Sequence, residues 1–242
     1  GFDTEHTYIM HLGRLSENSR AYIKDIPAET AVGHLRTALE RIEQNPMIEA
    51  ASISQNSSPH IGSNRSQSMY RDTIQTRYSV LNRTVTPNFF KVFKYRSTNG
   101  NTDELVQALE RGELVLSIDV ANELFTANES PVGKQVSFSK SDSANLYRVG
   151  AISEIVRYDN FSNWNSYFAR QMDNDFLQMF TGEWVGGLEF CVRVKPEHDH
   201  DFIRRFREEM THQLRLGNYY LGDIQSIPVN KAAFQKDDIN DL

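Results

Sequence analysis

The sequence has neither a long apolar run that could span a membrane nor a second cysteine with which to form a disulfide bond. Only one of its 242 residues is a cysteine, Cys191, so an intrachain disulfide is impossible and cysteine usage does not reveal the redox compartment. No stretch approaches the roughly 20 consecutive apolar residues that a membrane span needs. An integral membrane chain is therefore excluded for these 242 residues.

Positive charge is also scarce. The chain has 26 Lys and Arg against 32 Asp and Glu, which gives a formal net charge of −6. Proteins that bind duplex DNA need clustered Lys and Arg to neutralise phosphates. The densest basic cluster, Arg204, Arg205 and Arg207, is followed directly by Glu208 and Glu209, a pattern typical of a solvated helix face. We therefore expect no nucleic-acid partner.

What the sequence does have is a globular composition, with 39% hydrophobic residues. A chain of this length forms one large domain or two small ones and buries a sizeable core without disulfide or metal staples. The sequence starts GFD, without methionine, and we expect it to be an excised part of a longer protein.

A strand–helix–strand pattern lies near the start of the chain. Residues 7–12 favour a strand, residues 27–44 a helix, and residues 47–54 a second strand. Pro27 suits the first helical turn, and the apolar stripe of the helix consists of Val32, Leu35, Leu39 and Ile42. The helix is predicted to end at Asn45 and Pro46.

The same pattern recurs near the end. Residues 188–194 favour a strand, residues 196–201 a polar link, and residues 219–227 a strand. Between them, a helical stripe consists of Phe202, Phe206, Met210 and Leu214, with Gly217 at the position expected after a helix. Each helix has one apolar stripe, and each unit alone is too small to bury it, so we expect the two units to share one sheet.

The middle of the chain is less regular. Polar residues 56–67 favour a loop. Strands are expected at residues 73–85, 114–118, 132–138 and 146–155, a turn at 139–145, and helices at 86–93, 103–111, 120–125 and 165–180. The predicted fold class is therefore α+β: residues 1–56 plus 183–242 form the two-unit subdomain, and residues 57–182 form an inserted, smaller mixed α/β subdomain.

No catalytic motif is present, and we assign no catalytic, cofactor-binding or metal-binding residue. The cluster nearest to a metal site is Glu197, His198, Asp199, His200 and Asp201. Two histidines two residues apart share a face only on a strand, whereas this segment leads into a helix. Asp199 or Asp201 as a helix cap is the favoured interpretation.

The other residues with chemical potential are predicted to be structural. Cys191 lies in a predicted strand, in phase with Glu189 and Arg193, without the base that a reactive thiol needs. Trp164 and Trp184 could line a ligand groove, but core packing or cover of the subdomain junction is favoured. Further residues given a structural interpretation are His6, His11, His34, His60, His212, Val185, Gly186 and Gly187.

Several short segments, in order along the chain, resemble the periplasmic core domain of MacB/FtsX-type ABC transporter permeases. GFDTE at residues 1–5 looks like the segment after the first membrane helix of that family, and NPMIEAA at residues 45–51 resembles its turn from a helix into a strand. Further matches are TPNFF at 86–90, VLSIDVANELF at 115–125, SPVGKQV at 130–136 and RVGAI at 148–152. The family's "GR.F" element is not visible around residues 94–100.

The resemblance implies an extracytoplasmic domain between two membrane helices of an inner-membrane permease, with a porter-like two-unit subdomain and a Sabre-like insert. Implied partners are a cytoplasmic ABC ATPase, a second permease copy and a periplasmic adaptor or lipoprotein. The implied function is to relay ATP-driven conformational change to periplasmic work such as substrate efflux or lipoprotein release, without enzymatic activity or a cofactor in this domain. Fold-level analogy does not establish the substrate.

A free-standing periplasmic ligand-binding or sensor domain is the alternative, and an enzyme built on residues 197–201 is a third class. A permease domain must return both chain ends to one membrane surface. We therefore expect the ends to emerge on one face, with the loop at residues 56–67 and the insert toward the far end. We also expect the isolated domain to be a monomer or a weak dimer.

Overall fold

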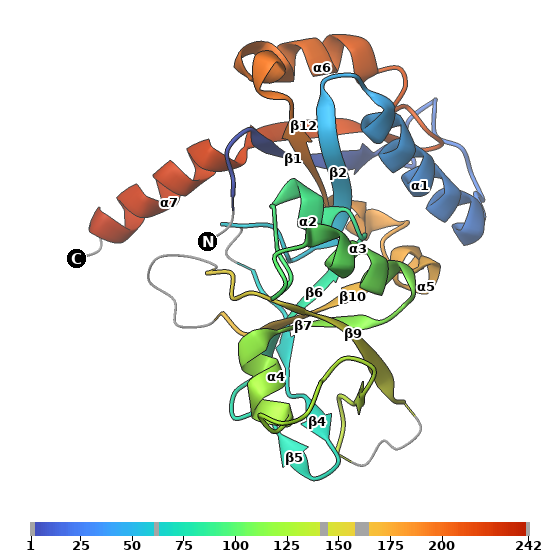
Figure 1. The fold of residues 1–242 in the computed structure, drawn as a ribbon. Helices are drawn as coiled ribbons and strands as arrows, with labels where there is room; N and C mark the ends of the chain where they lie inside the picture. The colour runs from blue at the N-terminus through green and yellow to red at the C-terminus, as the bar shows by residue number, and fades with distance from the viewer. Residues whose placement is uncertain (1–2, 61–62, 141–144, 158–164, 241–242) are drawn as a thin grey trace.

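The computed structural model describes residues 3–60, 63–140, 145–157 and 165–240. Its main sheet has ten strands, nine of them in the order β12-β1-β11-β2-β6-β10-β7-β9-β8, with β3 paired beside β6 (Figure 1). The strands are β1 (Thr7–Arg14), β2 (Ile48–Gln55), β3 (Ser66–Gln67), β6 (Val80–Val85), β7 (Leu114–Ser117), β8 (Gln135–Val136), β9 (Tyr147–Ser153), β10 (Tyr167–Gln171), β11 (Leu188–Val194) and β12 (Tyr219–Ser226). Strands β4 (Tyr70–Arg71) and β5 (Ile74–Gln75) form a separate pair.

The first half of this sheet, β12-β1-β11-β2, is built from the two strand–helix–strand segments. All three of its strand pairs are antiparallel. Because the two terminal segments of the chain interleave, strands about 180 residues apart in sequence, such as Thr7 and Arg193, lie side by side. This is the split β-α-β arrangement, and the two units share one sheet as expected.

Helices α1 (Ala28–Gln44) and α6 (Phe202–Met210) cover one face of this half. The stripe on α1 that the sequence indicated is buried, and Phe202, Phe206 and Met210 are buried on α6. Both stripes join one apolar cluster with the inward residues Tyr8, Met10 and Leu12 of β1. Burial of such side chains contributes about 1.5–3 kcal/mol each to folding.

The opposite face is covered where the two halves of the sheet meet, by α2 (Phe89–Val92) and α3 (Thr102–Glu110). Phe89, Phe90 and Phe93 are buried there, as their apolar pattern predicted. Their cluster reaches from Ile9 on β1 to Tyr167 on β10 and includes Ile227, the first residue of helix α7 (Ile227–Asn240). One core therefore spans both halves.

The remaining elements are short. They are α4 (Ile118–Leu124), α5 (Asn174–Gln178) and the 3-10 helices η1 (Glu183–Gly187) and η2 (Pro196–Asp201). The mixed helix and strand content confirms the α+β class. None of the helices in the described part of the chain combines the length and the apolar composition that crossing a membrane requires.

The helix expected at residues 165–180 is wrong, because this segment forms strand β10 followed by the short helix α5. Strand β10 lies between β6 and β7 and is packed on both faces, with Tyr167 and Ala169 in one apolar cluster and Phe168 in another. All three side chains are buried, so no polar–apolar alternation marks the strand. Its neighbours are set by tertiary contacts that a local pattern does not contain.

Two expected strands are also wrong in extent. The strand at residues 73–85 is broken between β5 and β6. The first part pairs with β4 instead, and the Thr76 N–H extends that pairing by donating to the carbonyl oxygen of Met69 (3.0 Å). Of residues 132–138 only β8 is a strand, because Pro131 and Gly133 (φ +88°) form the turn that their residue types favour. Helix α6 ends at Met210, earlier than its stripe suggested, and Gly217 (φ +54°) lies in the turn before β12.

Strand β12 forms one outer edge of the sheet and contains an irregularity opposite His11. A side chain at Gly222 would come within 2.6 Å of the backbone oxygen of His11, so only glycine fits this approach. The Gly222 carbonyl oxygen accepts a hydrogen bond from Arg207 Nη2 (2.8 Å) on α6.

Candidate functional site

The most unusual group in the described structure is the guanidinium of Arg193, on β11. The sequence places it in phase with Glu189 and Cys191, on the face of β11 that α2 contacts. Strand β11 lies between β1 and β2, and its side chains join apolar clusters on both faces of the sheet. The Arg193 side chain is therefore only 2% exposed. A buried charge is strongly unfavourable unless it is paired and hydrogen-bonded.

Arg193 meets this requirement with three backbone carbonyl oxygens. Its Nε donates to Val92 (2.7 Å), its Nη1 to Glu5 (2.8 Å) and its Nη2 to Asp3 (2.7 Å). The rigid fork of donors on a guanidinium can hold such a fixed set of acceptors at once. One side chain thus joins the N-terminal segment (residues 3–6) to the central strand β11 and to α2.

Asp3 adds an electrostatic connection to the same point. Its carboxylate oxygens lie 3.3 Å from Arg193 Nη2 and 3.4 Å from Lys94 Nζ. Partial burial raises the pKa of Asp3, but the combined attraction of Arg193 and Lys94 outweighs it and leaves the pKa below its usual value. The carboxylate of Asp3 is therefore stabilised in its charged form.

A second connection is made by Asp199 in η2. Its Oδ1 accepts a hydrogen bond from the Tyr8 hydroxyl (2.7 Å), and its Oδ2 lies 3.0 Å from His6 Nδ1. Burial, followed by the hydrogen bond to Asp199, raises the pKa of Tyr8 above its ordinary value. The backbone oxygen of His6 also accepts from the Val194 N–H (2.8 Å). We call residues 3–6 with Arg193, Val92, Lys94 and Asp199 the N-terminal junction.

The chain leaves the sheet close to where it enters. Tyr8, near the start of β1, pairs with Ser226, the last residue of β12, and α7 begins at the next residue. Ile227 is 1% exposed and anchors the base of α7 in the shared core. Figure 1 shows α7 extending from the sheet on the side where the first described residues lie. This placement agrees with the expectation that both ends emerge on one face.

A second buried charge lies four residues before Arg193 on the same face of β11. Glu189 is 4% exposed and accepts hydrogen bonds from Ser54 Oγ (2.8 Å), from the N–H groups of Ser57 (3.0 Å) and Ser58 (3.1 Å), and from Ser58 Oγ (2.9 Å). Cys191, between the two charges, is fully buried; burial and then the charge of Glu189 raise the pKa of its thiol well above the ordinary value. The thiolate is therefore strongly disfavoured.

The structure corrects the capping interpretation of residues 197–201. Asp201 occupies the position before α6 but makes no capping hydrogen bond, and its carboxylate pairs with Arg204 instead (3.1 Å). Asp199 is used by Tyr8 and His6. Within the described residues, no group of three or more His, Cys, Asp or Glu side chains has the arrangement of a metal site.

Two further expectations need correction. Trp184 is 73% exposed, which contradicts core packing but not cover of the subdomain junction, while Trp164 lies outside the described residues. The loop after β2 does not lie at the far end: Asn56 and His60 line a groove of about 520 Å³ together with Asn230 of α7. Buried Glu189 holds the loop near the chain ends. The β4–β5 pair of the insert lies at the end of the molecule opposite α6 (Figure 1).

The candidate histidines form no metal-like group within the described residues, although His11 and His60 line the same groove. His6 belongs to the N-terminal junction, His11 Nδ1 lies 3.0 Å from Asp223 Oδ1, and His34 lies on α1. Sequence reasoning missed Arg193 as a functional residue. The available signal was a charged side chain in phase with other core-facing positions of an otherwise apolar strand.

Comparison with known proteins provides the family context. The sequence model of the MacB-like periplasmic core domain family matches residues 4–201. The fold is similar to that of the periplasmic region of MacB from Actinobacillus actinomycetemcomitans, with a TM-score of 0.55, 13% sequence identity, and 96% of this chain and 94% of that chain covered. It is also similar to a domain assigned to a permease protein from Porphyromonas gingivalis, with a TM-score of 0.52, 14% identity, and 93% and 94% of the two chains covered. No curated protein sequence matches the chain.

Proposed function

Because the chain belongs to the MacB-like periplasmic core domain family, found in ABC transporter permeases, we propose that it relays ATP-driven movement of membrane helices to work outside the cytoplasm. The work would be substrate efflux or lipoprotein release, as the family resemblance implies. The proposed partners are a cytoplasmic ABC ATPase, a second permease copy, and a periplasmic adaptor or lipoprotein. The proposed location is the inner membrane, with this domain in the periplasm.

The observation that carries this proposal is the buried Arg193 in the N-terminal junction. A relay needs a stiff connection between the chain that arrives from the membrane and the body of the domain. Three hydrogen bonds from one buried guanidinium supply such a connection to both β11 and α2. The paired positions of Tyr8 and Ser226 further support a domain held at one end by both of its chain termini.

We also propose that the domain divides into residues 1–56 plus 183–242 and residues 57–182. Support comes from the strand that links the two parts. Strand β2 pairs with β6 through only Ser54–Val85 and Gln55–Thr84, whereas it pairs with β11 through seven residues. A short ladder bends more easily than a long one, so the β2–β6 pair is the proposed hinge.

The test uses the full-length permease with its ATPase in lipid vesicles. Spin labels replace Tyr78 in the insert and Val229 on α7, which are 68% and 66% exposed, in a Cys191→Ala background. We expect ATP to change the distance between the labels. The change should disappear in Arg193→Met while ATP hydrolysis continues, and it should persist in the matched control Arg204→Met, which alters an exposed arginine.

An ATP-dependent distance change of wild-type size in Arg193→Met would contradict the role of the junction. No change in the wild-type protein would contradict the relay itself. The isolated domain is further expected to sediment as a monomer or a weak dimer at micromolar concentration, since the membrane helices would normally hold two copies together.

A further inference from the structure

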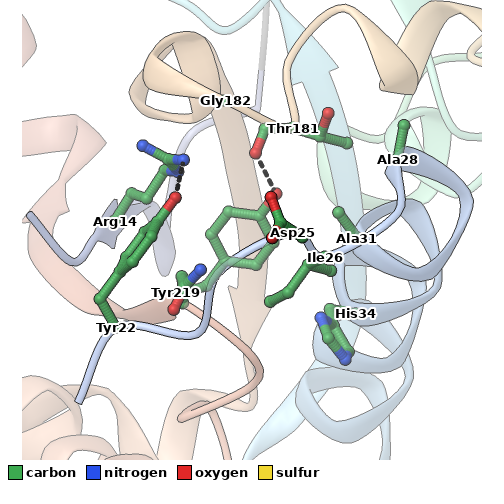
Figure 2. Close-up of a pocket in the computed structure, with 11 residues that line it drawn as sticks. Arg14, Tyr22, Asp25, Ile26, Ala28, Ala31, His34, Thr181, Gly182 and Tyr219 are labelled. Atoms are coloured by element: carbon green, nitrogen blue, oxygen red, sulfur yellow. Dashed lines mark hydrogen bonds between the residues drawn. The ribbon is translucent and has the colours of Figure 1, made fainter. Parts of the chain in front are cut away.

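A cavity of about 310 Å³ lies between the C-terminal end of β1, the start of α1 and the turn before β12. Figure 2 shows the ring of Tyr219 between Arg14 on one side and the first turns of α1 on the other. This volume is at the lower end of the range for small-molecule sites. The cavity is far from the N-terminal junction along β1, because Arg14 ends the strand that Thr7 begins.

One wall of the cavity is a loop held in place by hydrogen bonds. Buried Asn218 accepts from the Ile23 N–H at its Oδ1 and donates from its Nδ2 to the Ile23 oxygen, both at 2.8 Å. The Leu15 N–H donates to the Asn218 backbone oxygen (2.8 Å). The segment that carries Tyr22 and Asp25 is therefore fixed over the cavity, which makes the site preformed.

Arg14 supplies positive charge to this site. It is partly buried, and its Nη2 donates to the Tyr22 hydroxyl (2.8 Å) while its guanidinium lies 5.3 Å from the centre of the Tyr22 ring. Tyr22 thus orients the guanidinium. Among the described residues no carboxylate pairs with Arg14, so most of its donors remain available for an anion.

The opposite wall has further unused polar groups. Helix α1 begins after Pro27 without a side-chain cap, so its first N–H groups lack the usual side-chain acceptor. The imidazole of His34 also lines the cavity, but its Nδ1 atom is buried against Gly217. The N–H groups of the first turn of α1 are therefore the polar groups that this wall offers to a ligand.

We propose that this cavity binds a small monocarboxylate, with the carboxylate on the guanidinium of Arg14 and an apolar body over the ring of Tyr219. A planar guanidinium matches a carboxylate in geometry and charge. Ile26, Ala28 and Ala31 give the cavity apolar lining for a short hydrocarbon chain. Asp25 lines the same cavity and would repel a second carboxylate.

The test is an NMR titration of this chain with three compounds of equal chain length: valerate, its neutral amide valeramide, and the dicarboxylate glutarate. We expect saturable shifts around Tyr22 and Tyr219 with valerate, and binding at least about tenfold weaker with the other two. Arg14→Gln should weaken valerate binding to the level of the amide. The matched control Arg20→Gln, an exposed arginine in the same loop, should bind as the wild type does.

A second variant guards against misfolding of Arg14→Gln. Ala28→Phe keeps Arg14, changes an exposed position at the start of α1 and fills the cavity, so it should also abolish binding. Equal binding of valerate and valeramide, unchanged binding by Arg14→Gln or Ala28→Phe, or the absence of saturable shifts would overturn the proposal. Saturation by inorganic phosphate at lower concentration than by valerate would overturn the carboxylate assignment.

Discussion

The two halves of the sheet are stabilised by different kinds of contact. In the half built from the chain ends, the four strands have seven or eight residues each, and two helices bury a single apolar stripe against them. In the insert, strands are as short as two residues, and side-chain contacts fix the segments between them. Arg71, for example, pairs with Glu129 and lies 4.4 Å from the centre of the Phe125 ring.

From this difference we expect the half built from the chain ends to be the stiffer part and the insert to be the more adaptable part. Long ladders with continuous backbone hydrogen bonds resist bending, whereas a region fixed by individual side chains can change locally without disturbing the rest. The chain termini are attached to the regular half. A movement that enters there would reach the irregular half through the two-residue β2–β6 pairing and the shared core around Phe89.

The largest loss of stability is expected for Phe206→Ala, in the regular half of the sheet that is built from the chain ends. Phe206 is fully buried between α6 and the sheet, so we expect the free energy of unfolding to fall by about 3–5 kcal/mol. Urea unfolding followed by circular dichroism measures the loss. Phe138→Ala in the insert removes a partly buried ring and should cost clearly less. Equal losses would show that the two halves do not differ in packing.

A smaller effect is expected at the N-terminal junction. Arg193→Met keeps an unbranched apolar stem but leaves the carbonyl oxygens of Asp3, Glu5 and Val92 without their donor, at a cost of about 2–3 kcal/mol. Hydrogen exchange at the Val194 amide, which bonds to the neighbouring His6, should accelerate. Arg204→Met, on an exposed face, should change stability by less than about 0.5 kcal/mol. Unchanged exchange in Arg193→Met would mean that the segment is held by other contacts.

Glu189→Gln tests the hydrogen bonds that hold the loop after β2 close to the chain ends. The amide loses the negative charge and keeps one acceptor oxygen. Its NH₂ group faces either the Ser58 hydroxyl or the N–H groups of Ser57 and Ser58, so we expect a loss of about 1–3 kcal/mol. Faster amide exchange at Ser57 and Ser58 would locate the effect. Glu208→Gln, an exposed control, should leave both the loop and the stability unchanged. A Gln variant with wild-type protection would contradict the role of the carboxylate.

The smallest effect is a dependence on pH at Asp3. Its pKa in the folded protein lies below the ordinary 3.8, so its contribution to stability is present above that value and is lost as pH falls through the lowered folded pKa. Wild type should therefore be more stable than Asp3→Asn at about pH 6, with the difference vanishing toward about pH 2. Chemical unfolding at a series of pH values measures this difference. A difference that persists in acid would point to packing instead of charge.

The regular half was also the part that the sequence predicted well. The α1 stripe and the alternation in β11 are local patterns, and each matches one buried face. Strand β10 was missed because it lies inside the sheet, between two strands that come from distant parts of the chain. Local propensity does not contain that information. The division into subdomains remains a proposal, since the sheet runs continuously through both parts.

The candidate site was only partly visible in the sequence. Arg193 was noted for its phase in the strand, but its acceptors are backbone oxygens of residues 3, 5 and 92, which have no sequence signature. Asp199 or Asp201 was expected to cap a helix, because acidic residues before a helix often do so. The hydroxyl of Tyr8 competes for the Asp199 carboxylate, and only the pairing of distant segments reveals this contact.

The outer strand β12 has a consequence for how the domain behaves among copies of itself. An unpaired strand edge is a template for pairing with another chain and therefore for aggregation. At Gly222 the edge is irregular, and its carbonyl oxygen is already occupied by Arg207. A foreign strand would have to displace this side chain and would meet a ladder out of register. The hydrogen bond from Arg207 to Gly222 therefore opposes the pairing of another strand with β12.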